Sequence, residues 1–202
     1  MLAIVRVKMR NGNNDLWNYI VENDNTIESE FNGEAKLMYI TRRARHEDTS
    51  LFIHAKNPDV LGKFVADNIA AIEGVDKIWM VNLMGMRFFR IPEKLLDEWQ
   101  RLIVTVRVYP CKYSEVYNSI SRLPQTQDVA PVYLAYTFHL YGDSLMFSLV
   151  SKDLSSVQDY IQENIKNLPG VSGHTTTVIE KQQRLAPKED WKEYVKANLL
   201  RA

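Results

Sequence analysis

Two stretches of the chain place apolar residues at the spacing of one helical face. In residues 58–72 and 154–168 these positions follow an i, i+3, i+4, i+8, i+11 pattern. They are Leu61, Phe64, Val65, Ile69 and Ile72 in the first stretch, and Val157, Tyr160, Ile161, Ile165 and Leu168 in the second. A Gly-Val pair follows each stretch. Glycine suits the left-handed residue that ends many helices, so Gly74 and Gly170 indicate the ends of two amphipathic helices.

Both helices belong to an internal repeat. Residues 51–75 align without a gap on residues 147–171, at an offset of 96. Five pairs are identical: Lys56/Lys152, Asn68/Asn164, Ile69/Ile165, Gly74/Gly170 and Val75/Val171. Flanking segments repeat as well: 4–8 with 103–107, 36–39 with 133–136 at an offset of 97, and the segments from Pro92 to Trp99 and from Pro187 to Trp191.

Alternating apolar and polar residues predict the strands around these helices. The first copy reads β-α-β-β-α-β at residues 3–9, 13–22, 35–43, 49–56, 58–72 and 77–89. The second copy repeats this order at 102–109, 113–123, 132–140, 144–151, 154–168 and 174–182. The order is that of a ferredoxin-like unit, in which two helices cover one face of a four-stranded antiparallel sheet. We therefore predict an α+β protein with two tandem units, residues 1–98 and residues 99–202.

The predicted strands are apolar on both faces. Large apolar side chains occupy successive positions in residues 78–84, 132–140 and 145–150. Helices cover only one face of a ferredoxin-like sheet, and a large exposed apolar surface usually marks an interface. We expect the two units to pack sheet to sheet as a pseudo-dimeric α/β barrel within one chain, and the chain to form homo-oligomers.

Composition narrows the function classes. The 202 residues carry 25 Lys+Arg and 25 Asp+Glu, so the formal net charge is zero. Free-standing nucleic-acid binders usually have a basic excess, so direct nucleic-acid binding is not expected. No apolar run approaches the roughly 18 residues of a membrane span. The single cysteine, Cys111, excludes an intrachain disulfide. We expect a cytoplasmic protein that does not bind membranes.

The second copy resembles a known family. Its sequence contains Tyr141-Gly142-Asp143 between two strands, then Pro169-Gly170-Val171, and Thr176 five residues after that valine. This pattern is similar to the effector-binding domain of the Lrp/AsnC transcriptional regulators. The resemblance implies a dimeric α/β barrel that binds amino acids or related small molecules. Two departures are the tandem copies and the absence of a helix-turn-helix ahead of the first strand.

The resemblance indicates Tyr141, Gly142, Asp143 and Thr176 as ligand-binding residues, with Asp143 pairing with a ligand ammonium group. The same residues have plainer interpretations. Gly-Asp is common in hairpin turns, and threonine is favoured in strands. No catalytic residue, metal site or cofactor is expected: the four histidines lack paired ligand spacing, and the basic run from Arg42 to Arg45 is followed by compensating acids.

Three functions follow from this pattern. The favoured hypothesis is a non-enzymatic regulator that binds a small effector and acts through oligomerisation or through a helix-turn-helix partner protein. The second is an enzyme, because dimeric α/β barrels also include haem-dependent and monooxygenase-like proteins. In that case His139 or His174 would contact the cofactor or substrate. The third is a purely structural interaction module.

Overall fold

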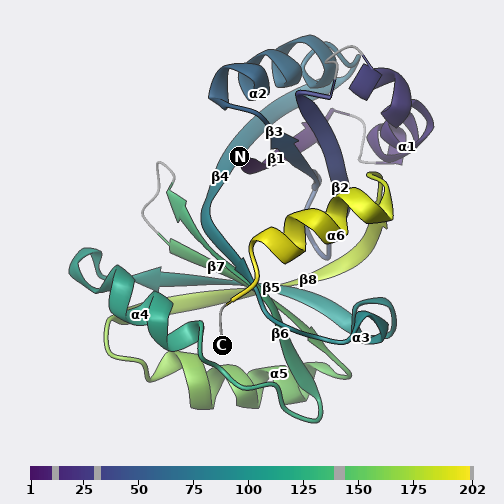
Figure 1. Ribbon diagram of the computed structural model, residues 1–202. Helices are drawn as coiled ribbons and strands as arrows, with labels where there is room; N and C mark the ends of the chain where they lie inside the picture. Colours follow the sequence, from purple (N-terminus) through teal and green to yellow (C-terminus); the bar gives the residue numbers. More distant parts are fainter. Residues whose placement is uncertain (11–13, 30–32, 139–143, 201–202) are drawn as a thin grey trace. The chain divides into compact units, whose positions relative to one another are not determined.

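The structure is a computed structural model that describes residues 1–10, 14–29, 33–138 and 144–200 (Figure 1). The chain divides into two compact units. Unit 1 comprises Met1–Leu83 and Glu180–Lys192, and unit 2 comprises Met84–Ile179 and Glu193–Ala202. Two long strands, β4 (Val75–Phe88) and β8 (Val171–Arg184), each contribute one end to each unit.

Unit 1 is built on an antiparallel sheet in the strand order β4-β1-β3-β2. Its elements are β1 (Leu2–Met9), α1 (Asn14–Ser29), β2 (Ala35–Arg43), β3 (Asp48–Ala55), α2 (Pro58–Phe64), the π-helical segment η1 (Val65–Ile69) and the first part of β4. The last residues of β8 lie beside β2, and the Leu185 amide that follows them donates to the Met38 carbonyl at 3.1 Å.

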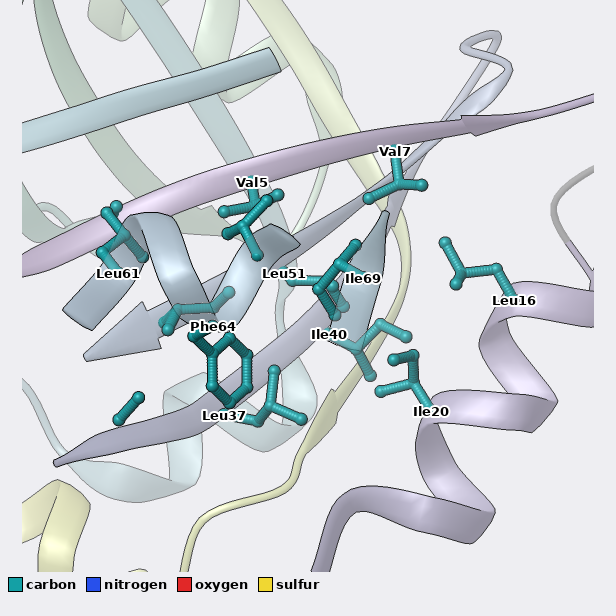
Figure 2. Close-up of a cluster of buried hydrophobic side chains, with 14 of the residues drawn as sticks. Val5, Val7, Leu16, Ile20, Leu37, Ile40, Leu51, Leu61, Phe64 and Ile69 are labelled. Atoms are coloured by element: carbon teal, nitrogen blue, oxygen red, sulfur yellow. The ribbon is translucent and has the colours of Figure 1, made fainter. Parts of the chain in front are cut away.

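The core of unit 1 lies between one face of this sheet and its helices. Alternate residues of β1, among them Val5 and Val7, point toward side chains of α1 and α2 such as Leu16 and Phe64 (Figure 2). The spacing that predicted an amphipathic helix at residues 58–72 therefore identified the buried face correctly. The other face of the sheet is free of α1 and α2, and in that sense we call it the helix-free face of unit 1. The start of α6 (Lys188–Ala197) contacts its β2 edge, where Trp191 meets Tyr39 edge to face at 4.8 Å.

Unit 2 repeats the arrangement in the strand order β8-β5-β7-β6. Its elements are α3 (Glu93–Glu98), β5 (Gln100–Val108), a 3-10 turn (Pro110–Lys112), α4 (Tyr113–Ile120), β6 (Val129–Phe138), β7 (Ser144–Ser151), α5 (Leu154–Ile161), the π-helical segment η3 (Gln162–Lys166), the first part of β8 and the end of α6 (Lys188–Ala197). The core joins β5 and β7 to α4 and α5.

The predicted α+β class is confirmed, and the order β-α-β-β-α-β occurs twice along the chain. The domain boundary at residues 98/99 and the sheet-to-sheet packing of two tandem units stay predictions. Among the described residues, no helix is both long and apolar enough to span a bilayer.

The two copies start their second helix with the same capping chemistry. The Asn57 side chain accepts a hydrogen bond from the Val60 amide at 2.9 Å. The Asp153 side chain, 96 residues later, accepts one from the Ser156 amide at 2.8 Å. Each bond satisfies an amide that the first helical turn leaves without a backbone partner.

The identical asparagines of the repeat have one role in both units. Each helix changes from α to π geometry, where backbone amides bond five residues back instead of four. The side chain of Asn68 donates to the Phe64 carbonyl at 3.2 Å, and Asn164 donates to the Tyr160 carbonyl at 3.0 Å. Each asparagine thus supplies a donor where the backbone ladder shifts.

The sequence alignment of residues 36–39 with 133–136 is wrong by three positions. In the sheets Tyr39 lies opposite Phe52, and Tyr133 lies opposite Ser148. Phe52 and Ser148 are 96 residues apart, but the two tyrosines are only 94 apart. Each second strand carries a bulge just before its tyrosine. Because β6 is apolar on both faces, its hydrophobic pattern could not determine the register.

The left-handed conformation predicted for Gly74 and Gly170 is confirmed, since both residues have positive φ values, 83° and 98°. The helices themselves end earlier, at Ile69 and Lys166, and each glycine lies in the turn that follows. The two glycines differ in surroundings. A Cβ atom at Gly170 would lie 2.5 Å from Lys112 Cβ, whereas one at Gly74 would lie 3.4 Å from the end of the flexible Met9 side chain.

We predict that Gly170→Ala destabilises the protein more than Gly74→Ala. Both variants place a Cβ in a left-handed conformation, at a cost of about 1–2 kcal/mol. Only Gly170→Ala adds an overlap, worth about 1–3 kcal/mol more. Urea unfolding of the two variants measures the difference. Equal losses of stability would contradict this placement of Lys112.

We predict a second effect at the α5 cap. Hydrogen bonds from the Ser156 backbone and from the Ser155 and Ser156 hydroxyls lower the pKa of Asp153 to about 2. A depressed folded-state pKa stabilises the fold above the unfolded pKa of about 4, and this stabilisation is lost as the pH falls from there toward 2. Asp153→Asn keeps the acceptor but removes the charge.

The melting temperature of Asp153→Asn should therefore depend less on pH between about 5 and 2 than that of the wild type. Asp159→Asn, an exposed carboxylate on the same helix, is the control. A wild-type pH profile in Asp153→Asn would show that the cap charge contributes nothing.

Candidate active site

Three of the four predicted ligand residues, Tyr141, Gly142 and Asp143, lie outside the described residues. The fourth, Thr176, is on β8 opposite Val104, where it is exposed on the same sheet face as the helix-covered core. His174 is on that face as well, opposite Val106, and His139 lies outside the described residues. The ligand-binding role of the four residues stays a prediction.

The helix-free face of unit 2, the sheet surface opposite α4 and α5, has an uncommon composition. Cross-strand register places two arginines, seven hydroxyl-bearing residues and several apolar ones there. They are Arg101, Ile103, Thr105 and Arg107 on β5; Tyr133, Ala135 and Thr137 on β6; Ser144, Met146, Ser148 and Val150 on β7; and Thr175, Thr177 and Ile179 on β8. None of these described residues is an acid, a histidine or a cysteine.

Arg101 is held against two neighbours on this face. Its guanidinium carbon lies 5.7 Å from the centre of the Tyr133 ring, within cation–π range. Its Nε lies 3.4 Å from the Ser148 hydroxyl, which in turn donates to the Leu102 carbonyl at 3.3 Å. Tyr133 and Ser148 are fully buried, whereas Arg101 is half-buried. The cation is therefore oriented by rigid neighbours.

The Tyr133 ring is itself fixed by other aromatic residues. It meets Phe88 edge to face at 6.0 Å, and Phe88 meets Tyr194 of α6 in the same way at 5.9 Å. The Tyr133 hydroxyl contacts the Met146 sulfur at 3.8 Å. The Phe89 amide donates to the Val132 carbonyl at 3.0 Å and so fixes the end of β4 beside β6. These contacts support the surface on which Arg101 rests.

The strand that carries Ser148 gave a signal that the sequence analysis missed. Ser148 stands alone among apolar residues in Leu145–Val150, and a lone hydroxyl in a buried strand needs a partner. Arg101 and Tyr133 gave no such signal, because an arginine at the start of a strand is ordinary. Only the cross-strand register brings these residues together.

Comparison with known proteins shows similarity of fold alone. No family model and no curated protein matches the sequence. Among solved structures, a "putative monooxygenase" from Lactobacillus acidophilus matches with a TM-score of 0.55 and 10% identity, over 92% of this chain and 98% of its own. An anthrone oxidase-like protein matches with a TM-score of 0.54 and 10% identity, over 93% and 94%. A mutant chlorite dismutase from Candidatus Nitrospira defluvii matches with 0.54 and 11%, over 96% and 95%.

These matches correct two expectations. The resemblance to Lrp/AsnC effector-binding domains is wrong, and so is the hypothesis of a transcription-linked, non-enzymatic regulator, because the structural neighbours carry oxygenase, oxidase and dismutase names. The misleading motif was local: the left-handed Gly170 lies in the turn between a helix and β8, and its carbonyl accepts from the Tyr109 amide at 2.9 Å. A glycine there reflects turn geometry and carries no information about a ligand.

The described residues of this face do not fit haem. Haem iron is usually held by histidine or cysteine thiolate, and neither occurs among the residues that the structure describes on the helix-free face of unit 2. Its one tyrosine, Tyr133, is buried with its hydroxyl at the Met146 sulfur. Elsewhere, burial, the N-terminal amine and Lys36 lower the pKa of His54. The described part of the chain holds no group of three acids, histidines or cysteines suited to a metal ion.

We predict that the aromatic ring of Tyr133 stabilises the fold and that its hydroxyl contributes little to stability. Tyr133→Phe keeps the contacts with Phe88 and Arg101 and should lower stability by less than about 1 kcal/mol. Tyr133→Leu loses both ring contacts and should cost about 2 kcal/mol or more. Thermal and urea unfolding separate the variants. Similar losses in both would place the important contact at the hydroxyl.

Proposed function

We propose that the protein is an enzyme that oxygenates a small, acidic aromatic substrate with molecular oxygen and without a cofactor. The observation that carries this proposal is Arg101, a cation supported by Tyr133 and Ser148 on a sheet face whose described residues include no acid. Such a face favours an anion over its neutral form, because an opposite charge nearby lowers the pKa of the bound group.

The substrate must supply its own reactivity, since the described face contains no histidine or carboxylate to act as a base. Dioxygen reacts readily with a stabilised carbanion or phenolate. A methylene group between aromatic rings, with a carbonyl in conjugation, ionises to such an anion. Arg101 would hold its oxygen by charge-assisted hydrogen bonds, and Ile103 and Met146 would contact the rings.

The reaction balances without a reductant. The methylene C–H bond breaks and its proton goes to water, leaving a carbanion whose charge is shared with the ring oxygen. A C–O bond forms as the carbanion is oxidised by dioxygen to a substrate peroxide. The peroxide anion takes up one proton to give a hydroperoxide. The second methylene C–H bond then loses its proton to water, its electron pair forms the C=O bond as the O–O bond breaks, and the hydroxide that leaves takes up a proton to give water. The sum is R–CH2–R′ + O2 → R–CO–R′ + H2O.

The fold of this chain supports the proposal, because proteins named as monooxygenase and anthrone oxidase-like share it over more than nine-tenths of its length. We also propose the finer arrangement: two tandem ferredoxin-like units packed sheet to sheet, in a homo-oligomeric cytoplasmic protein. Its support is that apolar residues on both helix-free faces, such as Phe52, Val81 and Met146, are buried.

We predict that the purified protein consumes oxygen with anthrone as the substrate. Mass spectrometry with isotopically labelled dioxygen should find one labelled oxygen atom in the quinone product. Arg101→Gln should lower kcat/KM about a hundredfold or more, because it removes the group that stabilises the developing anion. Arg101→Lys should retain part of the activity, since it keeps the positive charge but loses the planar guanidinium with its parallel hydrogen-bond donors.

Arg122→Gln is the matched control, because Arg122 is an exposed arginine just after α4. Its kcat/KM should equal that of the wild type. Absence of catalysed oxygen uptake with anthrone and related activated methylenes would overturn the proposed function. An unchanged kcat/KM in Arg101→Gln would overturn the assignment of the site.

A further inference from the structure

The helix-free face of unit 1 carries a second polar cluster, independent of Arg101. Cross-strand register aligns four residues on neighbouring strands: Trp79 on β4, Arg6 on β1, Ser50 on β3 and Thr41 on β2. Directly opposed side chains lie about 5 Å apart at their Cβ atoms. Arg6 is half-buried, and Ser50 and Thr41 are each 3% exposed.

Charged residues lie next to this cluster, toward the hairpin between β2 and β3. Arg43 Nη2 makes two bonds, at 2.6 and 2.5 Å, to the carboxylate oxygens of Asp48. Lys8 pairs with Glu47 nearer the hairpin. The cations in this part of the face are Arg6, Lys8, Arg43 and Lys77, which lies opposite Lys8, and Glu47 and Asp48 pair with Lys8 and Arg43.

Two buried polar atoms of the cluster lack hydrogen-bond partners within the described structure. They are the Ser50 hydroxyl and the Nε of Arg43, each with almost no exposed surface. Arg43 lies two residues beyond Thr41, the cross-strand partner of Ser50, so the two side chains are diagonal neighbours. Buried polar groups are nearly always satisfied, so two orphaned donors side by side indicate a missing acceptor.

The hairpin at residues 44–47 marks the exposed end of this cluster. Burial, Arg43 and Arg6 lower the pKa of His46, and Asp48 only partly opposes them. The positive potential of both arginines therefore extends to the hairpin. Arg45, His46 and Glu47 are exposed there.

We propose that Arg6, Arg43 and Ser50 form a binding site for a small carboxylate. A carboxylate accepts from both donors that lack partners, and its planar pair of oxygens matches a guanidinium. As an anion it is also attracted by the guanidinium groups of the cluster. The site lies on the other unit's sheet from Arg101, so it goes beyond the proposed oxygenation and does not depend on it.

Acetate is the probe for this site. The melting temperature should rise saturably with acetate at constant ionic strength, since a ligand that binds only the folded state stabilises it by mass action. Ser50→Ala should weaken acetate binding about tenfold, the value of one hydrogen bond to a charged group. In the absence of acetate the same variant should melt at the wild-type temperature or above, because it removes an unsatisfied hydroxyl.

Thr49→Val is the matched control. The Thr49 hydroxyl is also buried without a partner, but its strand position places it on the opposite face, in register with Val7. This variant should leave acetate binding unchanged. Arg6→Gln should weaken it, whereas Arg45→Gln, in the exposed hairpin, should not.

Inorganic phosphate tests whether the site prefers a carboxylate to another kind of anion. Acetate binding that exceeds phosphate binding supports the carboxylate assignment, and stronger phosphate binding overturns it. The absence of a saturable shift, or equal acetate affinity in Ser50→Ala and the wild type, would overturn the site. Ser50→Ala should keep its oxygen uptake with anthrone, so failure of this site and failure of the oxygenation are separately visible.

Discussion

Strands that are buried on both faces determine what this protein can do. Every residue of β7 is buried, and so are seven of the eight residues of β3. Helices account for one face of each sheet, so a polar side chain on the other face must find a partner or carry an energetic cost. Ser148 meets this requirement through Arg101 and Leu102. Ser50 does not meet it within the described residues. Both candidate sites follow from this one constraint.

The two copies of the repeat agree where the backbone requires a particular side chain and differ on the faces that carry the two proposed sites. Asn57 and Asp153 both cap a helix, and Asn68 and Asn164 both support a π segment. On the helix-free faces the equivalent positions diverge, since Ser50 and Phe52 of β3 correspond to Met146 and Ser148 of β7 at the offset of 96. Each unit therefore places an arginine beside a serine hydroxyl, Arg6 with Ser50 and Arg101 with Ser148, but at different positions along the repeated strands.

Much of the fold could be predicted from the sequence, because helical periodicity, caps and strand alternation are local. The bounds predicted for β2 and β7 agree with the structure to the residue, and the left-handed conformation of Gly74 and Gly170 was predicted correctly. The register of β6 could not be predicted, because a strand that is apolar on both faces pairs equally well after a shift. The cluster of Arg101, Tyr133 and Ser148 depends on that register, since a shift of three would place Tyr136 on the helix-free face instead.

The absence of acids among the described residues on the helix-free face of unit 2 determines how strongly Arg101 can stabilise a bound anion. A guanidinium stays charged at any working pH, so it cannot serve as an acid or base, and its effect is to stabilise negative charge. With a carboxylate beside it, most of that effect would be cancelled within the protein. Arg101 contacts the face of a buried aromatic ring and a neutral hydroxyl, which orient the cation. In the reaction that we propose, the substrate anion meets this oriented cation, and an electron-rich anion is the form in which an aromatic molecule reacts with dioxygen.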